Sequence, residues 1–238
     1  TISHIWKKNW WPIFKKNNTL IIAISKRLEI LAKKFDLKNI WQRPNPVDEN
    51  KFFIDYKKKY FLRNKLTKFN QDDVVLNLVA NFIDRKNQLF ALDVLSLLPK
   101  KFKLILAGPL KTENNMYHQN LLNKITSLRL NDRVEIQTGF IDNFDEYLKC
   151  SDVFLFPTWN EALGTPILEA QACGIPVVAN FMTGSSEFLI KNEVGGYLVE
   201  KFDATVWANK IELALKISDE KLANNSLKIW DTSGNWVE

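Results

Sequence analysis

Short apolar runs alternate with longer amphipathic stretches along the chain from Asp72 onward. The apolar runs have the length and the β-branched and aromatic content of buried strands, and they cover residues 74–80, 102–107, 134–138, 153–156, 177–179 and 196–199. Helical spacing fits the stretches 86–98, 115–128, 143–149, 166–173, 185–190 and 204–216. Alternation of this kind is typical of right-handed βαβ units. The pattern therefore predicts an α/β fold with a doubly wound parallel sheet, in which ligands bind at the carboxyl ends of the strands.

The chain before Asp72 has a different pattern. Three elements are expected there: a strand at 19–25, a helix at 26–35 and a basic helical stretch at 56–69. Residues 1–18 place Trp, Ile and Phe near helical spacing among lysines. We interpret this start as packing against another part of the protein. A Lys-rich helix with an aromatic face is also a candidate for lying on an anionic membrane.

Composition adds an asymmetry of charge. The chain has 238 residues, of which 46% are hydrophobic, so it can bury a substantial core. No apolar run approaches the length of about 18 residues that spans a bilayer. Residues 1–70 hold 17 Lys/Arg and 5 Asp/Glu, a balance of +12, whereas residues 71–238 hold 16 and 22, a balance of −6. The first part of the chain is therefore basic and the second part acidic. Because no RNA-binding signature accompanies the basic part, we expect no nucleic-acid partner.

The two cysteines and two histidines suggest no catalytic or metal chemistry. Cys150 and Cys173 lack the spacing of metal ligands, and free thiols are typical of a reducing compartment. His4 and His118 have neither a metal nor a catalytic-triad context, so both are expected to be structural. We expect a cytoplasmic protein, peripheral at the cytoplasmic face of a membrane if the basic start meets lipid.

The stretch 157–178 carries the chemistry. Thr165 is a suitable N-cap, Pro166 suits the first helical position and Gly174 suits the position past the last turn, so a helix is expected over about 166–173. Glu161 then lies in the loop ahead of this helix and Glu169 in its first turn. Backbone N–H groups at a helix N-terminus attract anions. Two carboxylates beside a phosphate site would be repulsive unless each accepted hydrogen bonds from hydroxyl groups. A nucleotide-sugar supplies such hydroxyl groups on its sugar and on its ribose.

This stretch resembles a known signature. It reads Pro-Thr-x-x-Glu-Ala-x-Gly-x-Pro-x-x-Glu-Ala-x-Ala-Cys-Gly-x-Pro-Val-Val, and in its strand–loop–helix–strand setting it is similar to the signature of the retaining GT-B glycosyltransferases of family 4, the glycosyl transferases group 1. The resemblance implies the Rossmann-like C-terminal half of a GT-B fold. It further implies that Glu161 contacts the donor sugar and Glu169 the ribose. The diphosphate would lie on the amides of Gly164, Thr165, Pro166 and Ile167, and Leu163 would be a further donor-binding residue. Ala162 stands where the family more often has Gly.

Other positions match the family less completely. Lys86 fills the lysine of its Gly-Arg-x-x-x-x-Lys-Gly pattern, where Arg and Lys neutralise the diphosphate. Asn81 occupies the arginine position and cannot supply a charge, so either Arg85 helps or the site is weakened. Gly108 ends a strand as the family's Gly-rich turn does. Phe140 and Ile141 fall where the family holds the nucleobase with backbone groups.

The resemblance extends upstream and divides the chain. The positions that match the family's Ile-Ala-x-Ser … Pro-Asn-x-Val-Asp … Phe pattern are Ala23, Ser25, Pro44, Asn45, Val47, Asp48 and Phe52. Residues 1–48 are therefore expected to be a remnant of an N-terminal GT-B domain with the linker, and residues 49–238 the nucleotide-sugar-binding domain. Most of the N-terminal domain would be missing from these 238 residues.

The implied activity is that of a hexosyl-type glycosyltransferase that moves a sugar from a nucleotide-sugar donor to an acceptor hydroxyl with retention of configuration. Lys86 and the helix N-terminus would stabilise the departing diphosphate, and Glu161 would position the sugar. No Asp-x-Asp occurs, which is consistent with a metal-independent reaction without a cofactor. The acceptor, whether polysaccharide, lipid-linked glycan or small molecule, stays open, and we expect the isolated chain to transfer weakly.

Two alternatives remain open. The first is a non-catalytic nucleotide-sugar-binding module that acts with a partner chain, which the uncharged Asn81 favours. The second is a GT-B nucleotide-sugar epimerase, against which the complete glutamate string argues.

Overall fold

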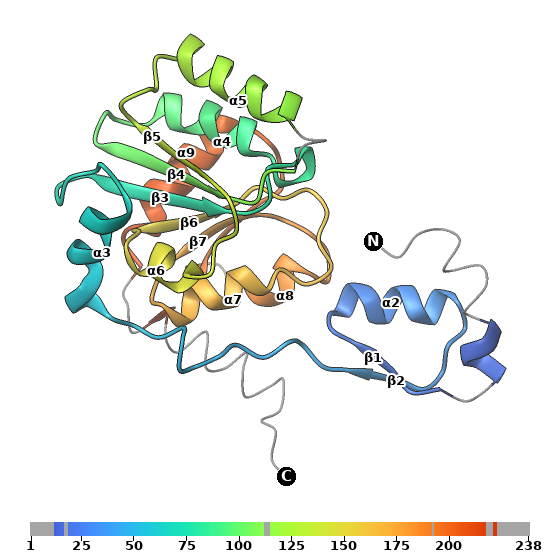
Figure 1. Cartoon of the computed structure of the whole chain (residues 1–238). Helices are drawn as coiled ribbons and strands as arrows, with labels where there is room; N and C mark the ends of the chain where they lie inside the picture. Colours follow the sequence, from blue (N-terminus) through green and yellow to red (C-terminus); the bar gives the residue numbers. More distant parts are fainter. Residues whose placement is uncertain (1–11, 17–18, 112–114, 192, 218–220, 223–238) are drawn as a thin grey trace.

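The computed structural model describes residues 12–16, 19–111, 115–191, 193–217 and 221–222. Within these ranges the chain forms a small N-terminal unit and a larger unit, joined by a segment without regular structure at residues 43–55 (Figure 1). Most of the basic Trp-rich start lies outside the described residues, and so does His4. Among the described helices, none combines the length and the apolar character that crossing a membrane requires.

The larger unit is built on a parallel sheet whose strands are ordered β5-β4-β3-β6-β7-β8. The strands are β3 (Val74–Val79), β4 (Phe102–Gly108), β5 (Val134–Thr138), β6 (Val153–Phe156), β7 (Val177–Asn180) and β8 (Gly196–Val199). All six lie where the apolar runs predicted them. The strand order reverses direction between β3 and β6, and such a switch point is where doubly wound sheets bind ligands.

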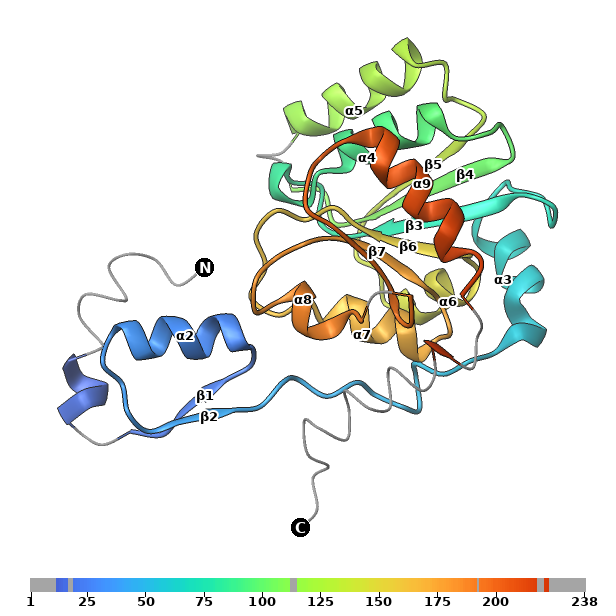
Figure 2. The ribbon, with the colours of Figure 1, turned by 180° about the vertical axis from the view of Figure 1, so that it is seen from behind.

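Helices cover both faces of this sheet (Figures 1 and 2). One face carries α4 (Gln88–Leu97), α5 (Asn115–Ser127) and α9 (Ala204–Ala214), and the other carries α3 (Lys59–Leu66), α6 (Phe144–Lys149), α7 (Thr165–Ala172) and α8 (Ser186–Leu189). The short 3-10 helix η1 (Tyr56–Lys58) precedes α3. The predicted doubly wound parallel sheet is confirmed.

The strands bury apolar side chains on both faces because successive side chains point to opposite sides. In β3, Leu76 and Leu78 pack with α4, α5 and α9, whereas Val75 packs with α3 and α6. In β6, Leu155 lies on the first face and Phe154 on the face covered by α7. Continuous apolar runs are therefore what a sheet covered on both sides requires.

Four predicted helix starts in the larger unit differ from the observed ones by one or two residues, and two of these bear on the site. The helix expected at 86–98 is preceded by a 3-10 turn, η2 (Asp84–Lys86), and α4 begins at Gln88 because Asn87 adopts a left-handed conformation with φ 58°. Thr165 is the first residue of α7 and not its N-cap; the N-cap is Gly164, with φ 94°. Glu169 therefore lies in the second turn of α7, one turn later than expected.

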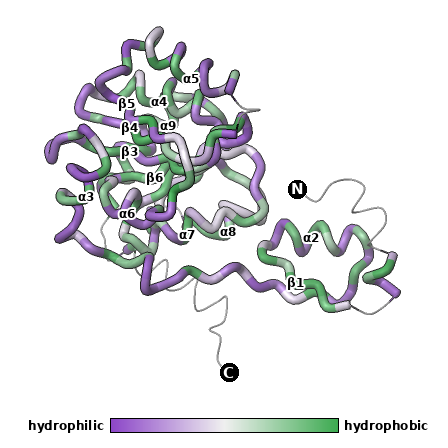
Figure 3. The backbone as a smooth tube through the Cα atoms, in the orientation of Figure 1, coloured by the Kyte–Doolittle hydropathy of each residue, from purple (hydrophilic) through white to green (hydrophobic). Residues whose placement is uncertain are grey.

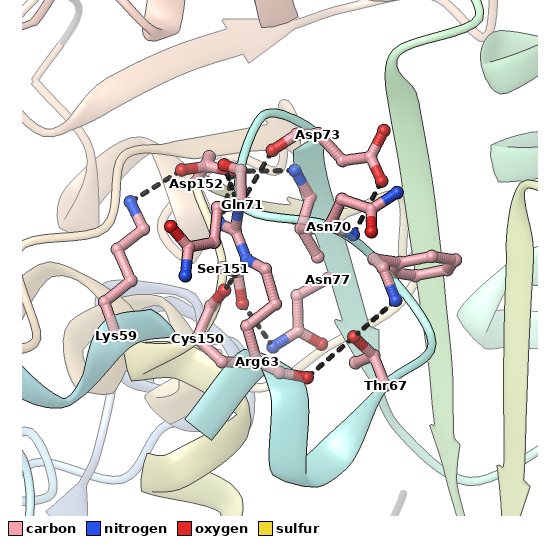
Figure 4. Close-up of polar contacts among 12 residues, drawn as sticks. Lys59, Arg63, Thr67, Asn70, Gln71, Asp73, Asn77, Cys150, Ser151 and Asp152 are labelled. Carbon is pink, nitrogen blue, oxygen red and sulfur yellow. Dashed lines mark hydrogen bonds and ion pairs between the residues drawn. The ribbon is translucent and has the colours of Figure 1, made fainter. Parts of the chain in front are cut away.

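A buried arginine ties α3 to the amino ends of the strands (Figure 4). The Arg63 side chain is 1% exposed, and its Nη2 donates to Asp152 Oδ2 at 2.8 Å. The same guanidinium donates to the carbonyl oxygens of Cys150, Asp73 and Gln71, at 3.0, 2.9 and 3.2 Å. A buried charge is tolerated when it is paired and hydrogen-bonded in this way.

The N-terminal unit consists of β1 (Ile21–Ala23), α2 (Lys26–Lys34) and β2 (Ile40–Gln42), with β1 and β2 paired in parallel. The hydropathy colouring is green along β1 (Figure 3). Ser25 caps α2, since its Oγ accepts from Leu28 N at 3.3 Å. The start of α2 touches the larger unit, because Arg27 N donates to Gly184 O at 3.0 Å in the loop between β7 and α8.

Candidate functional site

The candidate site lies at the carboxyl edge of the sheet, where the loops after β3, β6 and β7 meet. The loop after β6, residues 157–164, is held by its neighbours. Trp159 N donates to Arg85 O at 3.2 Å in the β3–α4 loop, and Ser185 Oγ donates to Leu163 O at 2.9 Å from the β7–α8 loop. Because β3 and β6 flank the switch point of the strand order, their loops are positioned to bind a ligand together.

The centre of the site is an ion pair between the two predicted catalytic residues. Lys86 Nζ lies 2.7 Å from Glu161 Oε2, and the two side chains are 12% and 22% exposed. Burial lowers the pKa of Lys86 below its ordinary value, while the bond to Glu161 opposes this. Burial also works to raise the pKa of Glu161, but Lys86 and Arg85 prevail and lower it. The Lys86 ammonium also lies 5.4 Å from the centre of the Phe156 ring.

A second cation at this pair comes from Arg85 and not from Asn81. Arg85 Nη1 lies 3.1 Å from Glu161 Oε2 and 3.0 Å from the carbonyl oxygen of Asn160. Asn81 is exposed after β3, and its carbonyl oxygen accepts from Gln88 Nε2 at 2.9 Å. Two positive charges therefore converge on one carboxylate even though the expected arginine position holds an amide.

The N-terminus of α7 offers fewer backbone donors than the sequence indicated. Pro166 has no N–H, and Ile167 N already donates to Gly164 O at 2.9 Å. For the N–H groups of Gly164 and Thr165 we find no acceptor among the described residues. Gly164 is needed for its left-handed backbone, and an added Cβ would also lie 3.1 Å from the Ile167 side chain. The donors that remain for an anion are those of Gly164 and Thr165.

Glu169 is a partly buried carboxylate on the same helix. Burial raises its pKa to about 7, and Lys51 opposes the rise. We find no hydrogen-bond partner for this carboxylate within the described part of the chain. Glu169 follows Thr165 by four residues, so both lie on one face of α7.

The remaining predicted residues lie at the ends of β4 and β5. Gly139 N donates to Gly108 O at 3.0 Å, which joins the two strand ends. Gly108 has φ +149°, and an added Cβ would lie 2.2 Å from Ala80 O. Phe140 follows with 82% of its surface exposed, and Ile141 packs partly against the core beneath α3 and α6. The edge of the sheet thus brings both segments beside the β3–α4 loop, while their contact with a nucleobase stays a prediction.

Sequence reasoning missed one residue of this region. Arg27, in the first turn of α2, donates from Nη2 to Asn160 Oδ1 at 3.0 Å and from Nη1 to Glu161 O at 3.2 Å. A cation in the first turn of a helix is disfavoured by the helix dipole. This unfavourable position is the feature of the sequence that could have marked Arg27 as a residue with a role in the site.

The histidine and cysteines in the described region stand apart from this site. His118 lies against the Phe82 ring, with centroids 5.8 Å apart. Cys150 and Cys173 are free and buried, and burial raises the pKa of each thiol to about 12. Neither thiol is therefore activated as a nucleophile.

Comparison with known proteins shows which family and which relatives this chain resembles. Residues 59–228 match the family described as glycosyl transferases group 1. The chain is 28% identical over 226 residues to UDP-Gal:alpha-D-GlcNAc-diphosphoundecaprenol alpha-1,3-galactosyltransferase of Escherichia coli, covering 90% of this chain and 55% of that protein. It is 30% identical over 214 residues to the capsular polysaccharide biosynthesis glycosyltransferase CapM of Staphylococcus aureus, covering 86% and 53%. The chain thus spans about half the length of these relatives.

Comparison with a solved structure supports the assignment of the fold. HepE from Anabaena, determined in complex with UDP and glucose, superimposes with a TM-score of 0.83 at 21% identity, covering 97% of this chain and 62% of that one. Its similarity extends over both units of the present structure. The chain therefore belongs to the glycosyl transferases group 1 family, and its six-stranded unit is the Rossmann-like C-terminal half of a GT-B fold.

Proposed function

We propose that this glycosyltransferase moves a hexosyl group from a nucleotide-sugar to an acceptor hydroxyl with retention of configuration, and that it needs no metal or cofactor. The observation that carries the proposal is the Glu161 carboxylate held by Lys86 and Arg85 beside the open N-terminus of α7. Two cations and unused backbone N–H groups fit a diphosphate, while a carboxylate fits sugar hydroxyls.

The proposed chemistry is mostly electrostatic. Bond cleavage at the sugar leaves negative charge on the diphosphate, and Lys86, Arg85 and the N–H groups of Gly164 and Thr165 stabilise that charge as it develops. Glu161 accepts hydrogen bonds from sugar hydroxyls and fixes the sugar for reaction. On donor binding, Lys86 shifts from the carboxylate toward the phosphates. Retention and metal independence come from the family resemblance and are part of the proposal.

We further propose a UDP-sugar as the donor to test first. The galactosyltransferase relative carries UDP-Gal in its name, and HepE was determined with UDP. Glu169 would accept hydrogen bonds from the ribose hydroxyls, and the backbone of Phe140 and Ile141 would hold the base. Gly108 and Asn81 would border the phosphates from the ends of β4 and β3.

The arrangement of the whole protein is a proposal as well. Residues 1–48 would be the last part of an N-terminal domain with the linker, and residues 49–238 the donor-binding domain. The acceptor, a polysaccharide, lipid-linked glycan or small molecule, would bind between the domains. We propose a cytoplasmic location, with the basic start as a candidate contact to the membrane face.

One competing function is a binding module that holds a nucleotide-sugar for a partner chain. Asn81 in place of arginine is the observation that favours it. Arg85 reduces the weight of that observation, because it places a second cation 3.1 Å from Glu161. The two proposals differ in turnover and not in binding.

The test is a thermal-shift screen of the chain against UDP, GDP, ADP and their common sugar conjugates, with and without divalent cations. Stabilisation by one nucleotide family without added metal is the expected result, since a ligand that binds only the folded state raises its stability. Transfer of radiolabelled sugar to acceptor mixtures by a version that includes the N-terminal domain then separates enzyme from binding module. Binding without any transfer supports the binding module, and a folded chain that binds none of these nucleotides contradicts both.

A further inference from the structure

The two units of the chain touch at the start of α2. Arg27 N, one of the N–H groups that α2 cannot satisfy within itself, donates to Gly184 O at 3.0 Å. Gly184 has φ +68°, and a Cβ at this position would lie 2.6 Å from Arg27 N. The close approach of the two backbones therefore depends on glycine at this position.

The Arg27 side chain continues from this contact to the β6–α7 loop. Its Nη1 donates to Glu161 O at 3.2 Å and its Nη2 to Asn160 Oδ1 at 3.0 Å. The acceptors are 134 and 133 residues away in sequence. A guanidinium offers two donors in a fixed fork, so it holds both acceptors in one geometry, which a flexible lysine does not.

Glu161 is consequently held from two sides. Arg27 of the small unit fixes its backbone carbonyl, while Lys86 and Arg85 of the large unit fix its carboxylate. If the backbone contact is lost, the carboxylate still pairs with the two cations, but the peptide that carries it can turn. The orientation of Glu161 then no longer depends on how the small unit is seated.

We propose that Arg27 is a positioning residue that couples the seating of the β1–α2–β2 unit on the sheet to the orientation of Glu161 toward a bound donor sugar. The inference rests on the proposed function, because the effect on a donor requires that Glu161 contacts its sugar. It gives the N-terminal unit a part in recognising the donor sugar without a direct contact to it. The Arg27 guanidinium donates to Glu161 O and Asn160 Oδ1, and not to Lys86 or Arg85, which are proposed to bind the diphosphate. Binding of the nucleotide without its sugar is therefore expected not to depend on Arg27.

The first test compares the binding of UDP and UDP-glucose by calorimetry in the wild-type chain, Arg27→Gln and Lys34→Gln. Lys34 is exposed in the last turn of the same helix, so its substitution matches the change of charge. Arg27→Gln is expected to weaken UDP-glucose binding about fivefold, the effect of losing exposed charge-assisted hydrogen bonds, and to leave UDP binding unchanged. Lys34→Gln is expected to change neither. Equal weakening of both ligands by Arg27→Gln, or no weakening, overturns the inference.

The second test needs no ligand. Hydrogen exchange followed by mass spectrometry reports on the peptide spanning residues 157–164 in the same three proteins. Arg27→Gln is expected to speed exchange in this loop about threefold without affecting the central strands, because local opening requires less free energy once the contact is gone. Unchanged exchange in the loop, or equal acceleration in the central strands, overturns the role of Arg27. If the wild-type chain binds neither UDP nor UDP-glucose, the proposed donor fails and the exchange result alone decides on Arg27.

Discussion

Lys86 Nζ lies 2.7 Å from Glu161 Oε2 although 75 residues separate the two in the sequence. The contact follows from the order of the strands, because Lys86 comes after β3, Glu161 after β6, and these two strands are neighbours at the switch point of the sheet. The pair therefore occupies the position where a doubly wound sheet presents its ligand-binding residues.

Replacing Glu161 by glutamine tests its proposed role in positioning the sugar. Glu161→Gln keeps the size of the side chain but removes the charge that Lys86 and Arg85 bind. We expect sugar transfer by a version with the N-terminal domain to fall at least about a hundredfold, the effect of removing one electrostatic contact to the reacting group. Circular dichroism should show an intact fold. Glu212→Gln, on the exposed side of α9, is the matched control, and transfer retained by Glu161→Gln would reject the role of this residue.

The sheet was predictable from the sequence because burial on both faces leaves a direct signature. All six strands of the larger unit were expected within two residues of where they lie. Helix starts were less predictable, since they depend on single backbone conformations. The left-handed Asn87 that delays α4 until Gln88 is one example, and the left-handed Gly164 that makes Thr165 the first residue of α7 is another.

The candidate site was predictable only as far as the strand ends determine it. Glu161 and Lys86 follow adjacent strands, so their proximity was implied once the topology was known. Arg27 belongs to the other unit, and its contact depends on how the two units meet, which no local pattern records. Arg85 was considered only as a substitute for the absent arginine, and the structure gives it a contact to Glu161 of its own.

The buried Arg63 should be the largest single contributor to stability among the charged residues described. Arg63→Met removes its pairing with Asp152 and leaves three carbonyl oxygens without this donor. Asp152 keeps its ion pair with Lys59, 2.6 Å away, so the loss comes mainly from the carbonyl oxygens. We expect the free energy of unfolding to fall by about 3–5 kcal/mol, because each buried acceptor left without a donor costs about 1–3 kcal/mol. Urea unfolding measures this. Lys57→Met, an exposed change of the same kind, should alter the free energy by less than about 0.5 kcal/mol, and similar losses in both variants would contradict the argument.

Two glycines offer a matched test of close backbone approach at the site. Gly108 and Gly139 have similar φ angles, +149° and +132°, so an alanine is strained at both. An added Cβ at Gly108 would lie 2.2 Å from Ala80 O, whereas at Gly139 it meets nothing within 4 Å. Gly108→Ala should therefore lower the free energy of unfolding by about 1–3 kcal/mol more than Gly139→Ala, the typical cost of forcing atoms into filled space. Equal losses in urea unfolding would show that the strand ends separate without cost.

Glu169 should give the stability of the protein a pH dependence that a glutamine variant lacks. Burial raises the pKa of this carboxyl to about 7, against an ordinary value of 4.5, with Lys51 opposing the rise. Between these two pH values the folded chain holds the proton while the unfolded chain has released it. The contribution of Glu169 to the free energy of unfolding therefore falls as the pH rises from 4.5 to 7 and stays low above that range.

Glu169→Gln has no such titration, so the difference between variant and wild type isolates it. At about pH 4 we expect the two proteins to have nearly the same free energy of unfolding. As the pH rises to about 7.5, the variant should become progressively more stable than the wild type, and above that pH the difference should stay constant. Urea unfolding of both proteins across this range measures the difference. Other carboxylates titrate in the same range, but they do so in both proteins and cancel. A difference that does not change with pH would mean that the Glu169 carboxylate is as well solvated in the folded chain as in the unfolded one.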